Sequence, residues 1–248
     1  MKYLSGVLLV LTVCFSQAQE KTLSRPDIPG DIMVDIGLNF WSDIPGQMDQ
    51  REWPSKSLGI YYTTRKVISN KFSYSYGVGL NFEKIAFGTN ALRFVPLVTD
   101  TLGVTSFTEE ITSTNRLLFK KYKLAILYMD IPLELRFHPK GTQDGEGFFV
   151  GAGGILGLRL NSYDKLITEL NGDKMKSKNV NDFGLNSFRY GLQFRLGFKG
   201  VHFFYKRYYQ NMFKNDISVL DAANPTLDDP AATFNPTMST FGINLTGF

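Results

Sequence analysis

The chain has few of the residues on which enzymes build metal or thiol chemistry. Its 248 residues include one cysteine, Cys14, and two histidines, His138 and His202. A metal centre needs clustered histidine, cysteine or carboxylate ligands, and no third ligand accompanies the two histidines. Both fall beside short turns, where we expect solvated side chains. We therefore predict no metal site, no cofactor and no thiol-dependent catalysis.

Long apolar segments are missing after the N-terminus. Residues 4–15 form an almost wholly apolar run, and Ser16-Gln17-Ala18 then supplies the small residues of a cleavage site. The pattern predicts a secretory signal peptide over residues 1–18, since the run is too short for a membrane-spanning helix. Residues 19–248 would then form one domain without a thiol. A lipoprotein signal that uses Cys14 is the alternative, which the bulky residue before it disfavours.

A strong charge of either sign is also lacking. Lysine and arginine total 27 and aspartate and glutamate total 23, and these charges are spread along the sequence. Nucleic-acid binding depends on a concentrated basic patch. We therefore expect no nucleic-acid partner.

The chain does contain stretches in which apolar residues recur at every second position. Successive side chains of a strand point to opposite faces, so alternating apolar residues predict strands with one apolar and one polar face. Pro132 interrupts one such stretch and indicates either a bulge or a mere irregularity of the wall, because proline cannot donate to the ladder. The predicted strands are 31–40, 58–63, 72–83, 125–137, 148–160, 188–199, 201–206 and 241–246.

The connections between these strands alternate in length. Short turns follow the second, fourth and sixth strands, and long connections cover 41–54, 88–119, 163–180 and 214–236. In a meander this alternation gathers all long loops at one end. The predicted fold is all-β: an eight-stranded antiparallel up-and-down transmembrane β-barrel with short periplasmic turns and long extracellular loops. A soluble periplasmic barrel, with its apolar face inward, is the alternative.

Three features favour an apolar face toward lipid. Several strands carry five to seven alternate apolar residues, enough for a band about 25 Å tall. The opposite face is rich in glycine, serine and asparagine, which leave room inside a narrow barrel. Aromatic residues near the strand ends are typical of interfacial girdles; they are Phe40, Trp41, Tyr61, Tyr62, Phe82, Phe87, Tyr163, Tyr205, Tyr208 and Tyr209.

One strand also carries a family resemblance. The segment Tyr128-Met-Asp-Ile-Pro-Leu-Glu-Leu-Arg-Phe137 resembles a strand motif of the PorT-like outer-membrane β-barrel proteins of Bacteroidota. The Gly-rich stretch that begins at Phe149 and the segment 186–191 are similar to theirs as well, so the likeness spans residues 120–210. The resemblance implies an outer-membrane barrel domain. One member of that family is implicated in protein secretion, but no residue here carries that role.

Charged residues on the polar face are the candidate functional set. An eight-stranded barrel is just wide enough for side chains to fill it, and charges enclosed there need partners. We expect a structural plug of salt bridges; a narrow ion or solute path is the alternative. The predicted lumenal charge network is Glu83, Asp130, Glu134, Arg136, Arg159, Arg189, Arg195 and Lys206.

These features predict a monomeric outer-membrane protein without catalytic activity, which has a structural or partner-binding role through its extracellular loops. The alternatives are a small-solute channel and, less favoured, a lipid-modifying outer-membrane enzyme, because both histidines fall at the periplasmic end. Expected partners are outer-membrane lipid, lipopolysaccharide, and a protein at the loops or in a secretion assembly. Lysines within 120–123 and 174–178 either contact anionic lipopolysaccharide groups or are simply solvated.

Overall fold

The fold is built from strands that close on themselves. The computed structural model describes residues 30–43, 50–88, 93–95, 107–109, 117–141, 147–170, 172–198, 200–219 and 232–246. The N-terminal residues 1–18, where the sequence predicts a signal peptide, lie outside these ranges. Within them, no helix has the length and hydrophobicity of a membrane span.

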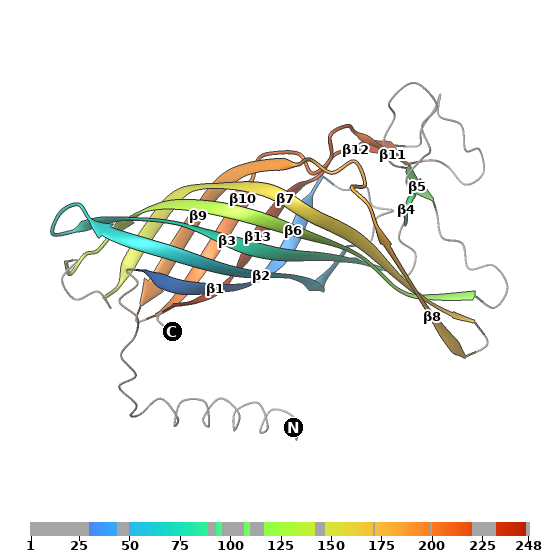
Figure 1. The fold of residues 1–248 in the computed structure, drawn as a ribbon, viewed down its shortest axis with the longest axis horizontal. Helices are drawn as coiled ribbons and strands as arrows, with labels where there is room; N and C mark the ends of the chain where they lie inside the picture. The colour runs from blue at the N-terminus through green and yellow to red at the C-terminus, as the bar shows by residue number, and fades with distance from the viewer. Residues whose placement is uncertain are drawn as a thin grey trace, which may run out of the picture.

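Eight long strands form a closed antiparallel barrel (Figure 1). Each pairs with the next of the eight along the chain, and β13 pairs with β1, so the barrel wall is closed. This confirms the fold class that the alternating pattern predicts. The barrel strands are β1 (Asp31–Ser42), β2 (Gln50–Val67), β3 (Phe72–Phe87), β6 (Leu117–Phe137), β7 (Phe149–Leu170), β9 (Phe188–Phe198), β10 (Val201–Tyr208) and β13 (Thr237–Thr246).

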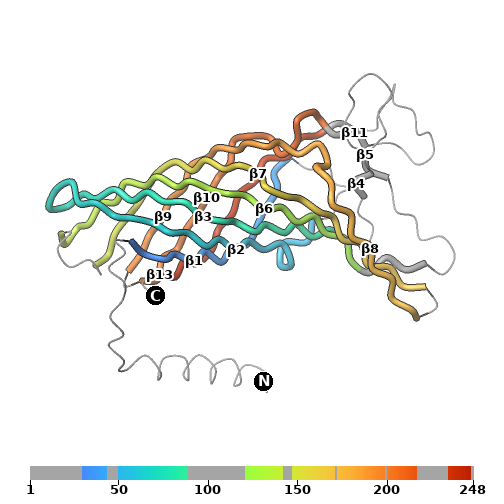
Figure 2. The backbone as a smooth tube through the Cα atoms, in the orientation of Figure 1, coloured from blue at the N-terminus to red at the C-terminus, as the bar shows by residue number. Residues whose placement is uncertain are grey.

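The connections predicted as long loops contain strands of their own. Residues 163–180 are a hairpin, because β7 continues to Leu170 and returns as β8 (Asp173–Val180) through Gly172, whose φ is 93°. With the start of β6, this hairpin forms an arm beyond the barrel (Figure 2). The sequence predicts a long connection there, and the structure gives it the form of a hairpin. Polar residues such as Asp164 and Lys165 occupy both faces of this part of β7, so the apolar alternation that indicates a strand is lost. A small second sheet contains β4 (Arg93–Val95), β5 (Phe107–Glu109), β11 (Ile217–Val219) and β12 (Ala232–Phe234).

Pro132 does not mark a bulge. It lies opposite Ile155 of β7, within a register that runs unbroken from Tyr128 to Phe137. The β6–β7 register instead shifts at Leu127/Tyr128 and again between residues 119 and 121. The irregularities of this strand pair therefore lie nearer the arm than Pro132 does.

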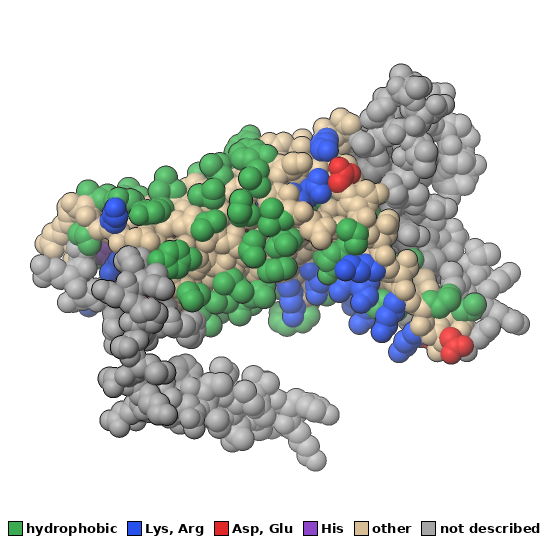
Figure 3. Space-filling view, viewed as in Figure 1, with side chains coloured by type: hydrophobic (Ala, Val, Ile, Leu, Met, Phe, Trp, Pro, Cys, Tyr) green, Lys and Arg blue, Asp and Glu red, His purple; other side chains and the backbone are tan. Residues whose placement is uncertain are grey.

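The barrel has apolar residues outside and polar residues inside. Ile36, Leu133 and Phe203 on its outer wall are 52%, 57% and 63% exposed. Figure 3 shows such side chains as a green band around the visible wall. Their neighbours along the same strands, such as Asp35 and Glu134, are buried. This polarity is the reverse of that of a soluble barrel.

The predicted aromatic girdle is only partly correct. Trp41, Tyr61, Phe87 and Tyr208 are buried inside the barrel, because each occupies an inward position of its strand. The other aromatic residues of that set are exposed or half-buried on the outer wall, for example Tyr62.

Candidate functional site

The most elaborate polar arrangement of the described residues is a buried ion-pair network inside the barrel. It contains four carboxylates and four cations, so its formal charges balance. All eight side chains come from inward positions of β1, β3, β6, β9 and β10. They are Asp35, Glu83, Asp130, Glu134, Arg136, Arg189, Arg195 and Lys206.

The part nearer the long connections is organised around Arg189. Its Nη1 lies 2.8 Å from Glu83 Oε1, and its Nη2 lies 2.8 Å from Asp130 Oδ2. The guanidinium carbon sits 3.5 Å from the ring centroid of Tyr128 and 4.0 Å from that of Tyr208. Two carboxylates and two aromatic faces therefore replace the water that this cation gives up on burial.

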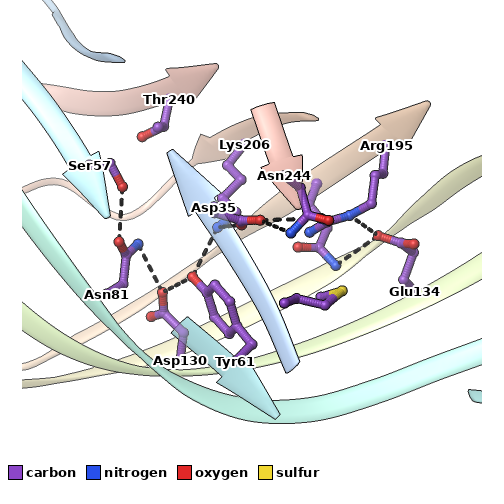
Figure 4. Close-up of polar contacts among 12 residues, drawn as sticks. Asp35, Ser57, Tyr61, Asn81, Asp130, Glu134, Arg195, Lys206, Thr240 and Asn244 are labelled. Atoms are coloured by element: carbon purple, nitrogen blue, oxygen red, sulfur yellow. Dashed lines mark hydrogen bonds and ion pairs between the residues drawn. The ribbon is translucent and has the colours of Figure 1, made fainter. Parts of the chain in front are cut away.

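Tyr61 joins this part to the rest of the network (Figure 4). Its hydroxyl donates to Asp130 Oδ2 at 3.3 Å and accepts a hydrogen bond from Lys206 Nζ at 2.9 Å. The same ammonium lies 2.7 Å from Asp35 Oδ2. The sequence interpretation missed both Tyr61 and Asp35 as network members, although alternation places both on the inner face.

The part nearer the short turns is organised around Glu134 and Arg195. Arg195 Nη1 lies 3.3 Å from Asp35 Oδ1, and its Nε donates to Glu134 Oε2 at 3.1 Å. Arg136 Nε donates to the other oxygen of Glu134 at 2.6 Å, while Asn244 Nδ2 donates to Asp35 Oδ1 at 2.6 Å. Polar contacts thus run continuously from Glu83 to Arg136.

Glycines of β7 make this network geometrically feasible. On β6, Asp130, Glu134 and Arg136 lie directly opposite Gly157, Gly153 and Gly151. The same glycines lie opposite Arg189, Gln193 and Arg195 on the other side, in β9. A methyl group at position 157 would overlap the carboxylate of Asp130. The carboxylates of β6 and the guanidiniums of β9 can therefore meet across a strand that has no side chains between them.

Arg159 does not join the lumenal network, contrary to the sequence prediction. It lies opposite Tyr128, at the edge of the β6–β7 register shift, and its guanidinium donates to the carbonyl oxygens of Leu185 and Asn186 at 3.2 and 3.3 Å. Its Nη2 also lies 3.8 Å from Asp182. The backbone N–H of Gly184, which donates to Asp182 at 2.9 Å, holds the pKa of this carboxyl below its ordinary value. Arg159 therefore anchors the segment that follows β8.

That segment contributes to an apolar cluster at the same end of the barrel. Trp41 packs edge-on against Phe87 and Phe213, with ring centroids 5.5 and 6.0 Å apart. Leu185 and Phe213 form a β-bridge, which joins the segment after β8 to the segment after β10. We call Trp41, Phe87, Phe183, Leu185, Met212 and Phe213 the apolar cap; all six are buried.

The two histidines are buried rather than solvated. His138 Nε2 lies 2.8 Å from Ser73 Oγ, and the ring of Phe149 lies 5.8 Å from His138 and 4.8 Å from His202. The expectation of solvated residues is wrong because the adjacent strand ends turn both rings inward. Across the described ranges, no group of three histidine, cysteine or acidic side chains is arranged to hold a metal ion.

Comparisons with known proteins give a distant structural likeness and no sequence match. No protein-family model and no curated protein matches the sequence. Among solved structures, the chain is similar to Ail, the attachment invasion locus protein of Yersinia pestis, in a crystal structure with the heparin analogue sucrose octasulfate. That match has 11% sequence identity and a TM-score of 0.31, and covers 89% of this chain and 100% of Ail. A likeness at this level says nothing of what the present chain binds.

Proposed function

We propose that the protein is an outer-membrane β-barrel with a filled lumen, which acts without catalysis by presenting its extracellular arm to a partner. The observation that carries this proposal is the apolar outer wall. Side chains such as Leu133 and Phe203 are more than half exposed, and they form a band around the barrel. A contiguous apolar surface of this extent is unsuited to water and suited to lipid.

The contacts inside the barrel favour the interpretation of a structural plug, rather than that of a path for solutes. Each charge of the network has a partner of opposite sign, and the apolar cap lies above it. Free charges that could bind and release a passing ion are not presented by this arrangement. The test is planar-bilayer conductance of the refolded protein: we expect no steady channels, and reproducible unit conductance would instead support the small-solute channel.

The arm supports a role in binding a protein partner. The hairpin of β7 and β8 projects beyond the barrel (Figure 1), and every residue from Asp173 to Ser177 is exposed. On its outer side, β8 has no neighbouring strand among the described residues, so its backbone is open to pairing with an added strand. Crosslinking from residues of β8 in native membranes, followed by identification of the attached protein, tests this role.

The targeting and family assignments belong to the same proposal. Residues 1–18 have the pattern of a signal peptide, and the Tyr128–Phe137 motif resembles PorT-like proteins of Bacteroidota. The structure gives that motif a physical meaning, because its three charged residues are network members opposite the β7 glycines. We expect the mature protein in the outer-membrane fraction, with an N-terminus at residue 19 and heat-modifiable gel migration. Extraction as a soluble protein would refute the proposal.

A further inference from the structure

A row of lysines crosses one side of the outer wall, between the apolar band and the arm. Lys56 lies directly opposite Lys84, Lys123 opposite Lys165, and Lys165 opposite Lys178. Lys84 and Lys123 occupy diagonal positions of β3 and β6. We call these five residues the lysine row. With strands about 4.8 Å apart, it spans about 19 Å across β2, β3, β6, β7 and β8. Figure 3 shows blue side chains between the green band and the tip of the arm.

The lysine row carries charge that no described carboxylate balances, although Lys56 and Lys178 lie 5.7 and 4.3 Å from the ring centroids of Trp53 and Tyr163. Like charges directly opposite each other on paired strands are destabilising, and this row contains three such pairs. Within the described part of the chain, none of the five ammonium groups forms an ion pair with a carboxylate. The isolated barrel therefore concentrates positive charge at a cost in stability, which an external anion would offset.

An apolar groove lies directly below the middle of the row. Its volume is about 260 Å³, and Phe82, Lys84, Ala125, Leu127 and Tyr163 contribute to its lining. The β6–β7 register shifts beside it, at Leu127. Lys84 belongs to both features, so an anionic head bound by the lysines would have its apolar tail at the groove.

The charge lies on one side of the barrel. On the wall opposite the row, the extracellular ends of β1, β10 and β13 carry Ser42, Arg207 and Ser239. Arg207 Nη1 donates to both serine hydroxyls, at 2.7 and 2.8 Å, so this cation already has partners. Non-specific attraction to an anionic membrane surface would not require the lysines to gather on one side of the barrel. A discrete binding site for one lipid does require it.

We propose that the lysine row and the groove below it form a binding site for a phosphorylated glycolipid of the outer leaflet, the lipid A part of lipopolysaccharide. The lysines bind its phosphate groups, and the groove receives part of an acyl chain. This inference rests on the outer-membrane location proposed above. It assigns the lipid contact to the barrel wall beside the arm, and it adds Lys56, Lys84 and Lys165 to the basic stretches visible in the sequence.

The test is titration of the refolded protein in neutral detergent micelles with purified lipid A, followed by native mass spectrometry. We expect saturable binding that weakens with salt. The triple variant Lys84→Gln/Lys123→Gln/Lys165→Gln should bind roughly a hundredfold more weakly, at about 1 kcal/mol for each lysine near a membrane surface. The matched control is Lys66→Gln, an exposed lysine on the same outward face of β2 near its opposite end, which should bind like the wild type.

Three further measurements separate this proposal from its rivals. Ala125→Phe, which fills the groove, should weaken binding of lipid A. Dephosphorylated lipid A should bind weakly, and inorganic phosphate should not compete at equal concentration. Equal binding by the triple variant, by dephosphorylated lipid, or equal competition by inorganic phosphate would overturn the lipid site.

Failure of the inference is distinguishable from failure of the outer-membrane proposal. Heat-modifiable migration and insertion into vesicles are measured on the same samples. The triple variant should fold at least as well as the wild type without lipid, because it removes like-charge repulsion. A barrel that inserts but does not prefer lipid A refutes the site alone, whereas a chain that never inserts refutes the location and the site together.

Discussion

Removing Lys206 from the interior should destabilise the barrel more than removing the charges of Lys206 and Asp35 together. The two side chains are 1% and 0% exposed, and their charged atoms lie 2.7 Å apart. In Lys206→Met, Asp35 keeps Arg195 at 3.3 Å as its remaining cation, and the hydroxyl of Tyr61 loses its donor. Breaking a buried pair in this way costs about 3–5 kcal/mol of unfolding free energy.

The double variant Asp35→Asn/Lys206→Met should recover much of that loss. It leaves three carboxylates and three cations in the network, so no net charge stays buried, and Arg195 keeps Glu134 at 3.1 Å. We expect a favourable coupling of about 2–3 kcal/mol between the two substitutions, near the upper end for residues in contact. Lys66→Met on the outer wall is the control, with an expected change within about 0.5 kcal/mol.

The assay is equilibrium unfolding of the refolded barrel by urea, followed by gel migration and by fluorescence of the buried Trp41. All four forms of the cycle are measured under the same lipid conditions. If the effects of the two substitutions simply add, the ammonium and the carboxylate are not energetically coupled. The argument that charge balance governs the interior would then be wrong.

Two other predictions test the surroundings of the network. Gly157→Ala should cost about 1–3 kcal/mol by overpacking against Asp130, whereas Gly154→Ala, with its nearest neighbouring atom 3.9 Å away, should change stability little in the same urea assay. In the segment after β8, the pKa of Asp182 is lowered from 3.8. The contacts of its carboxylate therefore stabilise this segment at neutral pH, and they weaken as the pH falls below 3.8 and the carboxylate is protonated. Hydrogen exchange of the Gly184 amide should show this loss of protection in the wild type and not in Asp182→Asn, and identical pH profiles would contradict the assignment.

The barrel is predictable from the alternation of apolar and polar residues, because this alternation is visible within each strand, whichever strands it pairs with. It placed Asp130, Glu134 and Arg189 on the inner face, where they are buried. It also indicated the glycine-rich face of β7, although not its purpose. Which charges meet depends on the β6–β7 and β7–β9 registers, and these become visible only when the strands are paired.

The sequence does not reveal which residues of distant strands are in contact. Asp35 and Arg195 are 160 positions apart, and they meet only because closure brings β1 and β9 to the same level of a narrow interior. The aromatic character of Tyr61 favours a place in a girdle, whereas its inward position on β2 puts it in the network. Arg159 has the same inward parity as Gly157, but its guanidinium binds carbonyl oxygens of the segment after β8, and the sequence does not reveal where that segment lies.

The interior charges specify the register of the barrel wall more than they contribute stability. Buried ion pairs add little over well-packed apolar residues, because desolvation offsets much of their attraction. A slip of β6 by one residue, however, would turn Asp130, Glu134 and Arg136 toward lipid and bury Leu133 and Leu135. An arginine on a lipid-facing strand costs about 2–4 kcal/mol at mid-membrane and about 0–1 kcal/mol near an interface, and acids cost somewhat less. Arg136 lies one residue from the end of β6, so Asp130 and Glu134 would carry most of this cost. The misplaced charges therefore disfavour the slipped register, while the β7 glycines leave the native register free of steric conflict.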